Sequence, residues 1–491
     1  MTDLLLSHGI LLTMDADDTI IADGALFIHE GRIAEIGTSR EVSTRHPGVE
    51  TIDASGMLVM PGLINTHTHL PMTLLRSLAD DIEATAWLPV VWSVEAHLRP
   101  QSIYAGALLG IAEMIASGTT CFNDQYIMMD QVAKAVAETG IRAQLAHGII
   151  ENRNPKKGQR ELEEGARFAA EWHGKAEGRI TARLGPHALY TCSTPLIRQA
   201  RRLADELGIG LHMHIAESKF EMRLVSKKHR AGETSVQHLD GLGVLRSDFV
   251  LAHGLNINEK DMEVLAQRGA GVAHCPQSYG KLGAYPFPAV DRWLRAGVRV
   301  GLGTDGSASN NNLDLFDEMR FASLARKLMA KDGTLLPARQ MLRMSTSMAA
   351  QVLGLEREIG SLEVGKRADV ILLNLRQPHL TPQHNLAGHL VYSASGGDVD
   401  TVMVAGRLLM RHRQFLTLDL EEVLERAQRE FEALLGRAGW MPTLAEPKSG
   451  LAATLRLKLV QQSYKLMQVL SGERAPEEEE IADPSDGLPA G

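Results

Sequence analysis

Cysteine is scarce in this sequence: among 491 residues there are only three, Cys121, Cys192 and Cys275. They are odd in number and far apart, and no two of them form a Cys-x-x-Cys pair. This spacing excludes a disulfide framework and a thiolate zinc site. So little cysteine is typical of a protein of the reducing cytoplasm, where we expect this one to be.

Long hydrophobic runs and an excess of positive charge are also lacking. No apolar run approaches the ~20 residues that cross a bilayer, and the N-terminus has neither the basic segment nor the cleavage site of a signal peptide. The formal net charge of -9 at pH 7 provides no basic field for binding nucleic acid. We therefore expect no membrane and no nucleic-acid partner.

The composition is that of a folded protein, with 44% hydrophobic and 23% charged residues. The length predicts two or three domains. In residues 1–60, short apolar segments alternate with turn residues, which indicates the first part of a small β domain. The predicted strands there are residues 9–14, 22–29, 32–36 and 57–60.

Residues 61–355 alternate between strand-like runs and longer helical stretches, the pattern of parallel βα units. Predicted helices include residues 102–117, 195–207 and 313–330. Eight units over roughly 290 residues predict an α/β fold of the (β/α)8 barrel type, whose usual length is ~250 residues. The predicted strands end near His67, Asn123, Gly148, His187, His214, His253, Cys275 and Asp305.

The region after the barrel has the same texture as the first sixty residues. Short strands with glycine turns in residues 356–420 predict the second part of the β domain, so that the barrel interrupts one discontinuous β-sandwich. Residues 421–470 are predicted as C-terminal helices, with one helix over 420–436 and another over 451–470. Residues 471–491 are acidic and rich in proline and glycine, and are predicted to be disordered.

The strongest local motif is PGLINTHTHL, in which His67 and His69 are two residues apart on an apolar strand and point to one side. Alone, this pair would also fit two hydrogen-bonded histidines in a turn. His214, His253 and Asp305 follow at the ends of later strands, which meet at the top of a barrel. Three histidines and a carboxylate that leave a position for water are typical of a catalytic divalent metal, zinc or iron(II).

Glu217 follows His214 by three residues, within reach of a substrate above the metal. It is predicted to move protons, although a glutamate also stabilises the start of a helix.

Two other motifs resemble those of known enzyme classes but do not predict these classes here. The GLGTDG segment at residues 301–306 matches a dinucleotide-binding pattern but ends the last strand. The zinc nucleobase deaminases with a Pro-Cys-x-x-Cys motif are excluded, because no such pair exists.

Six segments, taken together, resemble the amidohydrolase superfamily, and within it the 5'-methylthioadenosine/S-adenosylhomocysteine deaminases and their triazine-hydrolase relatives. The resemblance covers roughly residues 1–420 and implies a metal-dependent barrel with a β-sandwich built from both chain ends. It also implies one divalent metal per subunit, a small heterocyclic substrate and a homo-oligomer. The segments are PGLINTHTHLPMTLLRSLADD, GPHALYTCS, HMHIAES, LAHG, GLGTDGSASNNNLDLFDEMR and GSLEVGKRADVILLNL.

The resemblance also implies roles for individual residues. Glu217 would protonate the substrate ring, and His253 would orient the attacking water or the leaving group. Glu95 matches a glutamate that holds ribose hydroxyls, His187 matches a substrate-contacting histidine, and Trp87 would line the pocket beside Trp92. The implied metal ligands are His67, His69, His214 and Asp305, and Asp305 would also accept a proton from water.

Two departures from the family pattern bear on the substrate. The segment HCPQSYGKLGAYPFPAV carries Tyr279 where asparagine is common, with Tyr285 nearby, and His147 stands where an arginine would hold a homocysteine carboxylate. His274 receives no assignment. The predicted reaction is hydrolytic deamination of an amino-substituted N-heterocycle, chiefly a 6-aminopurine nucleoside. The alternatives are a triazine hydrolase or dechlorinase, a guanine-type base deaminase, and a non-catalytic assembly protein, which the complete set of ligands disfavours.

Overall fold

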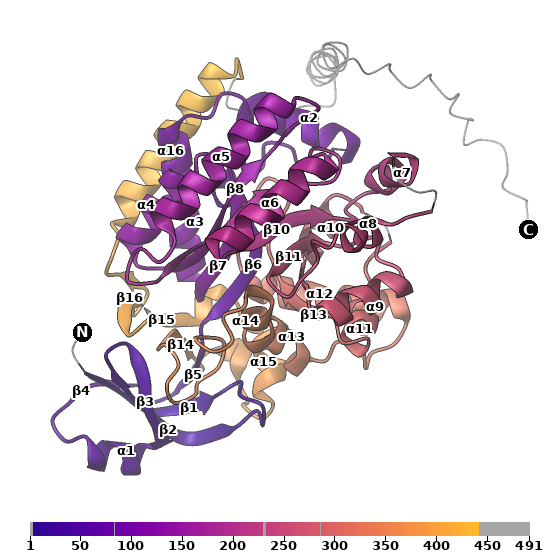
Figure 1. The fold of residues 1–491 in the computed structure, drawn as a ribbon. Coiled ribbons are helices and arrows are strands. Elements are labelled where there is room, and N and C mark those ends of the chain that lie inside the picture. Colours follow the sequence, from indigo (N-terminus) through magenta and orange to yellow (C-terminus); the bar gives the residue numbers. More distant parts are fainter. Residues whose placement is uncertain (1–2, 83, 229–231, 285, 441–491) are drawn as a thin grey trace, which may run out of the picture.

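Two β-sheets organise the molecule, which the computed structural model describes for residues 3–440 except 83, 229–231 and 285 (Figure 1). The larger body contains an eight-stranded sheet in the order β6 to β13, in which every neighbouring pair is parallel. Its strands are β6 (Leu63–Thr68), β7 (Thr119–Tyr126), β8 (Arg142–Ile149), β9 (Ile180–Pro186), β10 (Gly210–Ile215), β11 (Phe249–His253), β12 (Gly271–His274) and β13 (Arg299–Leu302).

The ring of strands closes between β13 and β6. Thr68 and Asp305 form a parallel bridge, and the Thr66 hydroxyl donates to the Leu302 carbonyl over 2.8 Å. All eight strands end within three residues of the predicted positions. The predicted (β/α)8 barrel is therefore confirmed.

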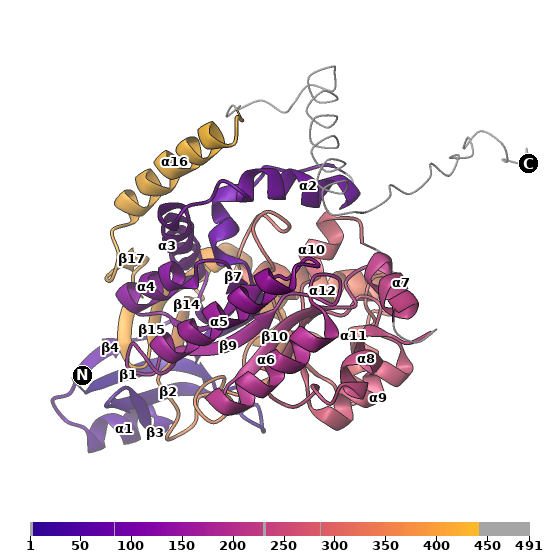
Figure 2. The same ribbon diagram turned by 45° about the horizontal axis from the view of Figure 1, so that its top comes forward.

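Helices surround the strands (Figure 2). Helix α6 shows how the sequence defines them: Ser193 caps its first turn, Gly208 ends it with φ +66°, and Leu196, Ile197 and Ala200 bury one face. The helices of this region are η1 (Leu70–Leu75), α2 (Ala84–Glu95), α3 (Pro100–Ala116), α4 (Met129–Thr139), α5 (Pro155–Trp172), α6 (Thr194–Leu207), α7 (Lys219–Lys228), α8 (Ser235–Gly241), α9 (Glu259–Arg268), α10 (Pro276–Lys281), α11 (Val290–Arg295), α12 (Leu315–Ala330), α13 (Ala338–Met344) and α14 (Ser347–Leu353).

The smaller sheet joins the two ends of the chain, as predicted. Strand β5 pairs antiparallel with β14, from Pro61 opposite Val370 to Met57 opposite Asn374. The strand order is β17-β16-β15-β14-β5-β1-β2-β3, with β4 beside β1. The elements are β1 (Leu4–Leu12), β2 (Ile20–His29), β3 (Arg32–Thr38), α1 (Ser39–Arg45), β4 (Glu50–Asp53), β5 (Met57–Pro61), β14 (Val370–Asn374), η2 (Pro378–Leu380), α15 (Leu386–Tyr392), η3 (Gly396–Asp398), β15 (Val399–Val404), β16 (Arg407–Arg411) and β17 (Gln414–Phe415).

A buried ion pair connects the two sheets. The Arg142 guanidinium at the start of β8 donates to both carboxylate oxygens of Asp369, over 2.7 and 2.9 Å. Asp369, just before β14, also accepts the Ala405 backbone N–H over 2.7 Å. Removing one partner of such a pair typically costs about 3–5 kcal/mol, because the other charge stays buried. The pair therefore holds the smaller sheet in one position on the barrel.

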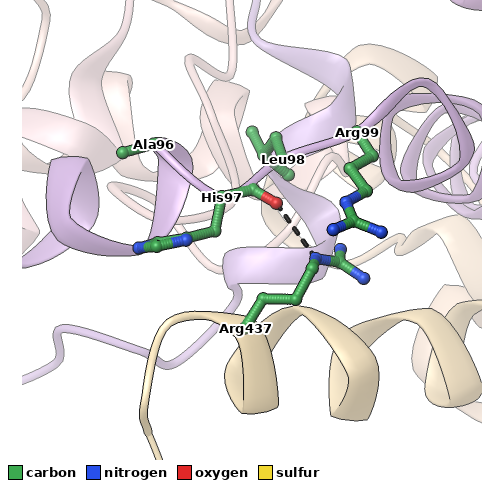
Figure 3. Close-up of a pocket in the computed structure, with 5 residues that line it drawn as sticks. All are labelled: Ala96, His97, Leu98, Arg99 and Arg437. Atoms are coloured by element: carbon green, nitrogen blue, oxygen red, sulfur yellow. Dashed lines mark hydrogen bonds between the residues drawn. The ribbon is translucent and has the colours of Figure 1, made fainter.

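The described chain ends after helix α16 (Leu420–Arg437), which packs beside α3 (Figure 2). Arg437 donates to the His97 carbonyl over 3.1 Å and helps to line a cavity of about 340 Å³ (Figure 3). The predicted helix over 451–470 and the acidic segment 471–491 lie outside the described residues. Within the described part of the chain, no helix is long and apolar enough to cross a membrane.

Candidate active site

Five of the predicted residues meet at the C-terminal end of the barrel. His67 lies on β6 and His69 directly follows it, His214 lies on β10, His253 ends β11, and Asp305 follows β13. The ligand atoms of His67, His69 and His214 lie within 4.8 Å of one another, as do those of His67, His253 and Asp305. The strands that carry these residues are far apart in the chain, and only barrel closure brings them together.

Hydrogen bonds fix the orientation of two of these rings. The Nδ1 atom of His69 donates to the Gln125 carbonyl over 2.6 Å, and that of His214 donates to the His187 carbonyl over 2.9 Å. A carbonyl can only accept, so each Nδ1 carries the proton and each Nε2 presents a lone pair. The two Nε2 atoms face each other at 3.1 Å. Two lone pairs this close are suited to a cation that both nitrogens contact from one side.

The His67 ring is oriented in the same manner. Its Nδ1 lies 2.9 Å from His212 Nε2, while its Nε2 is buried and has no hydrogen-bond partner among the described residues. His212, which is not among the predicted site residues, thus acts as the outer partner that metal-binding histidines usually have. A buried imidazole nitrogen without a partner fits a metal ligand. The donor set of nitrogen and carboxylate atoms fits zinc and iron(II) alike.

Asp305 completes the set of donors. Its Oδ1 lies 3.4 Å from His69 Nε2 and 3.5 Å from His67 Nε2. Its Oδ2 accepts hydrogen bonds from the Ser278 and Ser309 hydroxyls, over 2.8 and 2.9 Å. Burial alone would raise the pKa of Asp305, but the neighbouring histidines hold that pKa well below its usual value. The carboxylate is therefore charged, with one oxygen fixed by serines and the other directed at the histidines.

Glu217 lies beside this cluster, with its Oε1 3.8 Å from His253 Nε2. Its side chain is 37% exposed, so the carboxyl group can meet a substrate. Burial by the surrounding protein, together with the negative charge of Asp305, raises the pKa of Glu217 to about 7. A carboxyl group that is partly protonated at neutral pH is suited to donating and accepting protons.

Glu221 holds the backbone of the loop that carries Glu217, between β10 and α7. Its fully buried carboxyl group accepts the backbone N–H groups of Ala216 and Glu217, over 2.9 and 3.1 Å, and the Ser235 hydroxyl over 2.6 Å. Ala216 has φ +49°, a strained conformation for a residue with a side chain. The carboxyl group of Glu221 therefore holds this loop in shape. Glu221 is not among the site residues predicted from the sequence, although it lies only four residues after Glu217, in the first turn of α7.

His253 occupies the same cluster but is held differently. Its Nδ1 is buried and has no hydrogen-bond partner within the described chain, and its carbonyl accepts the Tyr279 hydroxyl over 3.3 Å. Its backbone has φ +78°, in the left-handed region that residues with a side chain rarely adopt. Tyr279 thus acts on the site through His253, by supporting its backbone.

The structure gives definite neighbours to three of the predicted substrate contacts, Glu95, His187 and Trp87. Glu95 ends α2 and accepts a hydrogen bond from the Tyr126 hydroxyl, while burial raises the pKa of Glu95 to about 7. The His187 ring lies 4.7 Å from that of His214, centroid to centroid. Trp87 donates to the Ala308 carbonyl over 3.0 Å, which fixes α2 to the loop after β13. The predicted contact Tyr285 lies outside the described residues.

His147 and His274, which have no assigned role, both pack against other parts of the protein. His147 on β8 lies 2.9 Å from Glu161 of α5, on the side of the strand that faces the helices. Its position therefore offers nothing to a substrate carboxylate. His274 is buried among aromatic rings, with the Tyr279 and Phe287 centroids at 5.5 and 5.8 Å. It packs beside helix α10, which carries Ser278 and Tyr279.

The model of the amidohydrolase family matches residues 58–409. A relative from Methanosarcina mazei named 5'-deoxyadenosine deaminase is 45% identical over 438 residues, which cover 89% of this chain and 99% of the relative. A 5-methylthioadenosine/S-adenosylhomocysteine deaminase from Desulforudis audaxviator is 46% identical over 413 residues, covering 84% of this chain and 95% of the relative.

Solved structures give the same picture of the fold. An adenosine deaminase from Xanthomonas campestris with bound zinc superposes with a TM-score of 0.84 at 31% identity, covering 89% of this chain and 99% of that one. An atrazine chlorohydrolase from Arthrobacter aurescens, complexed with zinc, has a TM-score of 0.80 at 24% identity, covering 87% of this chain and 100% of that one. The similarity to the atrazine chlorohydrolase shows only that the two folds are alike.

Proposed function

The chain belongs to the amidohydrolase family, and we propose that it is a metal-dependent deaminase of 6-aminopurine nucleosides. In this reaction water replaces the exocyclic amino group, and ammonia is released. The observation that carries the proposal is the position of Glu217, with a pKa of about 7, beside a set of histidines oriented to hold a metal. Relatives at 45% and 46% identity are named as deaminases of adenosine derivatives, which supports the same reaction.

The proposed metal ligands are the Nε2 atoms of His67, His69 and His214 and a carboxylate oxygen of Asp305. A divalent metal bound there supplies Lewis-acid activation of water at neutral pH. Zinc is the proposed metal, in keeping with the zinc in the Xanthomonas campestris structure.

Three side chains of the protein would then handle protons and orientation. Asp305 accepts a proton from the attacking water. The hydroxyls of Ser278 and Ser309 hold its Oδ2 atom in place. Glu217 protonates the ring nitrogen next to the carbon under attack, which removes the aromatic stabilisation only as the new bond forms. His253 donates a hydrogen bond to the incoming oxygen. Asp305 then returns the proton taken from water to the departing amino group by way of Glu217, and the amino group leaves as ammonia while the new hydroxyl group gives its proton back to Glu217.

Glu95 is the proposed contact for the ribose hydroxyls, with His187 and Trp87 at the sides of the substrate. A ribose contact has no role with a triazine or a free base, so Glu95 favours nucleosides over those alternatives. The Tyr126 hydroxyl donates to one oxygen of Glu95 and leaves the other oxygen for the sugar. Adenosine, 5'-deoxyadenosine, 5'-methylthioadenosine and S-adenosylhomocysteine share this purine and ribose. We further propose a cytoplasmic homo-oligomer.

The test is a substrate panel on the purified, metal-analysed protein. Ammonia release is measured for adenosine, 5'-deoxyadenosine, 5'-methylthioadenosine, S-adenosylhomocysteine, guanine and an aminotriazine, with chloride release from a chlorotriazine in parallel. We expect a kcat/KM at least a hundredfold higher for one of the nucleosides than for guanine or the triazines. Activity confined to guanine or the triazines would contradict the nucleoside assignment while retaining the metal centre.

A further inference from the structure

Glu318 on helix α12 is an acidic residue whose side chain is completely buried. Its Oε2 atom accepts the backbone N–H of Gln277 over 3.2 Å, and its Oε1 atom accepts the side-chain amide of Asn310 over 2.5 Å. Neither donor carries a charge, although a fully buried glutamate is usually paired with a cation. These two hydrogen bonds therefore offset the cost of burying the carboxyl group.

The first donor belongs to the start of helix α10, which packs beside α12 (Figure 2). The residue before α10 makes no capping hydrogen bond with its side chain, and Pro276, the first residue of the helix, has no N–H group. The free N–H of Gln277 is capped instead by Glu318, from the neighbouring helix. The next residue, Ser278, donates its hydroxyl to Asp305 Oδ2 over 2.8 Å. Glu318 thus fixes the backbone beside the first serine partner of Asp305.

The second donor belongs to the loop after β13. The Asn310 side-chain amide also donates to the Thr304 carbonyl over 2.7 Å, which ties the loop back to the residue directly before Asp305. Ser309, the residue directly before Asn310, donates its hydroxyl to the same Asp305 Oδ2 over 2.9 Å. Asp305 itself has φ +58°, in the left-handed region that residues with a side chain rarely adopt. The surroundings must therefore hold this backbone, and the contact between Asn310 and Glu318 is part of them.

Glu318 thus contacts the neighbours of both serines that hold Asp305. On one side it meets the residue before Ser278, and on the other side the residue after Ser309. Both hydroxyls bind one oxygen of Asp305, while its other oxygen lies 3.4 Å from His69 Nε2. A shift of either segment would turn this carboxylate, and a displacement of about 1 Å at a reacting group can lower a rate about a hundredfold.

We propose that Glu318 is a positioning residue for Asp305. Through its two hydrogen bonds it keeps Ser278 and Ser309 in register, so that both hydroxyls hold Oδ2 and leave Oδ1 directed at the histidines. The role of Asp305 in turnover rests on the proposed function. The same clamp also determines how firmly the site retains a metal, which can be measured without any turnover.

Glu318→Gln tests the clamp in the full-length, zinc-loaded protein. Glutamine has nearly the same shape, but its amide has one accepting oxygen and presents an NH2 group to the second donor. We expect kcat for the best nucleoside to fall at least tenfold with less than a threefold change in KM, because the sugar contact is intact. Zinc release to a chelator should become at least fivefold faster.

The matched control is Asp317→Asn, which changes the neighbouring acid on the same helix. The Asp317 side chain is 38% exposed, and its substitution should change kcat and zinc release less than twofold. Circular dichroism checks that each variant is folded.

A second background separates positioning from a general loss of structure. In Ser278→Ala/Ser309→Ala no hydroxyl holds Asp305, so adding Glu318→Gln should change kcat and zinc release less than twofold further. A residue that only stabilised the fold would act by the same factor in both backgrounds. Asn310→Ala interrupts one arm of the clamp, so its effect should disappear in Ser309→Ala and persist in Ser278→Ala.

Wild-type kcat and zinc release in Glu318→Gln, or equal factors in the two backgrounds, would overturn the proposal. If no substrate of the panel releases ammonia, the deaminase assignment fails, and the zinc-release factors alone decide on the positioning role. If Glu318→Gln does not fold, the comparison of Asn310→Ala in the two single-serine backgrounds decides instead, and equal effects there would overturn the proposal.

Discussion

The Nε2 atoms of His69 and His214 face each other at 3.1 Å, although the two residues are 145 positions apart in the chain. The Nδ1 atom of His69 donates to the Gln125 carbonyl, and that of His214 donates to the His187 carbonyl, so both rings are fixed in orientation. The two lone pairs would repel each other in the absence of a cation. The barrel therefore holds these nitrogens in place for a metal before any substrate arrives.

His214→Ala should lower the bound metal from about one per chain to less than a tenth of that, because it removes one nitrogen from the facing pair. Ammonia release should fall with the metal content. The measurement is elemental analysis of the dialysed protein beside a deamination assay. The control is His412→Ala, since His412 is an exposed histidine of the smaller sheet. Full metal content in His214→Ala would contradict the ligand assignment.

Glu217→Gln should lower kcat about a hundred- to ten-thousandfold, the usual contribution of a positioned acid or base. Glutamine has nearly the same shape but cannot deliver a proton to the ring nitrogen. Metal content should stay the same, which separates loss of proton transfer from loss of the site. Glu259→Gln, on exposed α9, is the matched control. The assignment fails if the Glu217 variant turns over substrate at the wild-type rate.

At a pH of about 8.5, where a carboxyl group with a pKa of about 7 is charged, Glu95→Gln should raise KM for nucleosides about tenfold to a hundredfold, because hydrogen bonds to a charged group contribute about 1.5–3 kcal/mol. A 2',3'-dideoxy nucleoside lacks the hydroxyls, so for this substrate the variant and the wild type should have similar KM values. The measurement is the ratio of the variant KM to the wild-type KM, determined for each of the two substrates. An equal loss for both substrates would show that Glu95 acts on something other than the sugar.

Glu221→Gln should change how stability depends on pH. Burial raises the pKa of Glu221 from 4.5 to about 7 in the folded protein, so between these values the folded state holds a proton that the unfolded state has lost. The stabilisation from this group is present below pH 4.5 and is lost as the pH rises through 7. Relative to the variant, the wild type should lose about 3 kcal/mol across this window.

Urea unfolding at several pH values between 4.5 and 8 measures this difference, with Glu259→Gln as the control. Parallel pH profiles for the wild type and Glu221→Gln would contradict the prediction. The same variant should lower kcat more than it raises KM, because it loosens the backbone that positions Glu217 and leaves the sugar contact intact.

The barrel could be predicted from the sequence because several of its buried parallel strands contain a short apolar run before a polar residue, as the sequence FVLA does before His253 in β11. Strand β4 was missed, since only Ile52 of its four residues is buried and no apolar pattern marks it. Strand β1 begins at Leu4, five residues before the predicted start, because its first leucines pack in the core of the smaller sheet. Both differences lie in the smaller sheet, which contains parallel and antiparallel pairs. In such a sheet, the neighbouring strands decide which residues are buried.

The candidate ligands could be predicted because strand ends converge in a barrel, whichever residues lie between them. The supporting residues Ser278, Ser309 and Glu221 could not be predicted in this way. They reach the site from loops and helix starts, where the direction of a side chain depends on backbone angles such as φ +58° at Asp305. Serine and glutamate are also common in such places for local reasons.

The closure of the barrel has a consequence for the empty and loaded forms of the protein. Among the described residues, β6 and β13 share the bridge between Thr68 and Asp305, whereas the other neighbouring strands form ladders. The proposed ligands lie on both sides of this junction, with His67 and His69 on one side and Asp305 on the other. Metal loading should therefore slow amide hydrogen exchange most in β6 and β13, where the first and last strands meet.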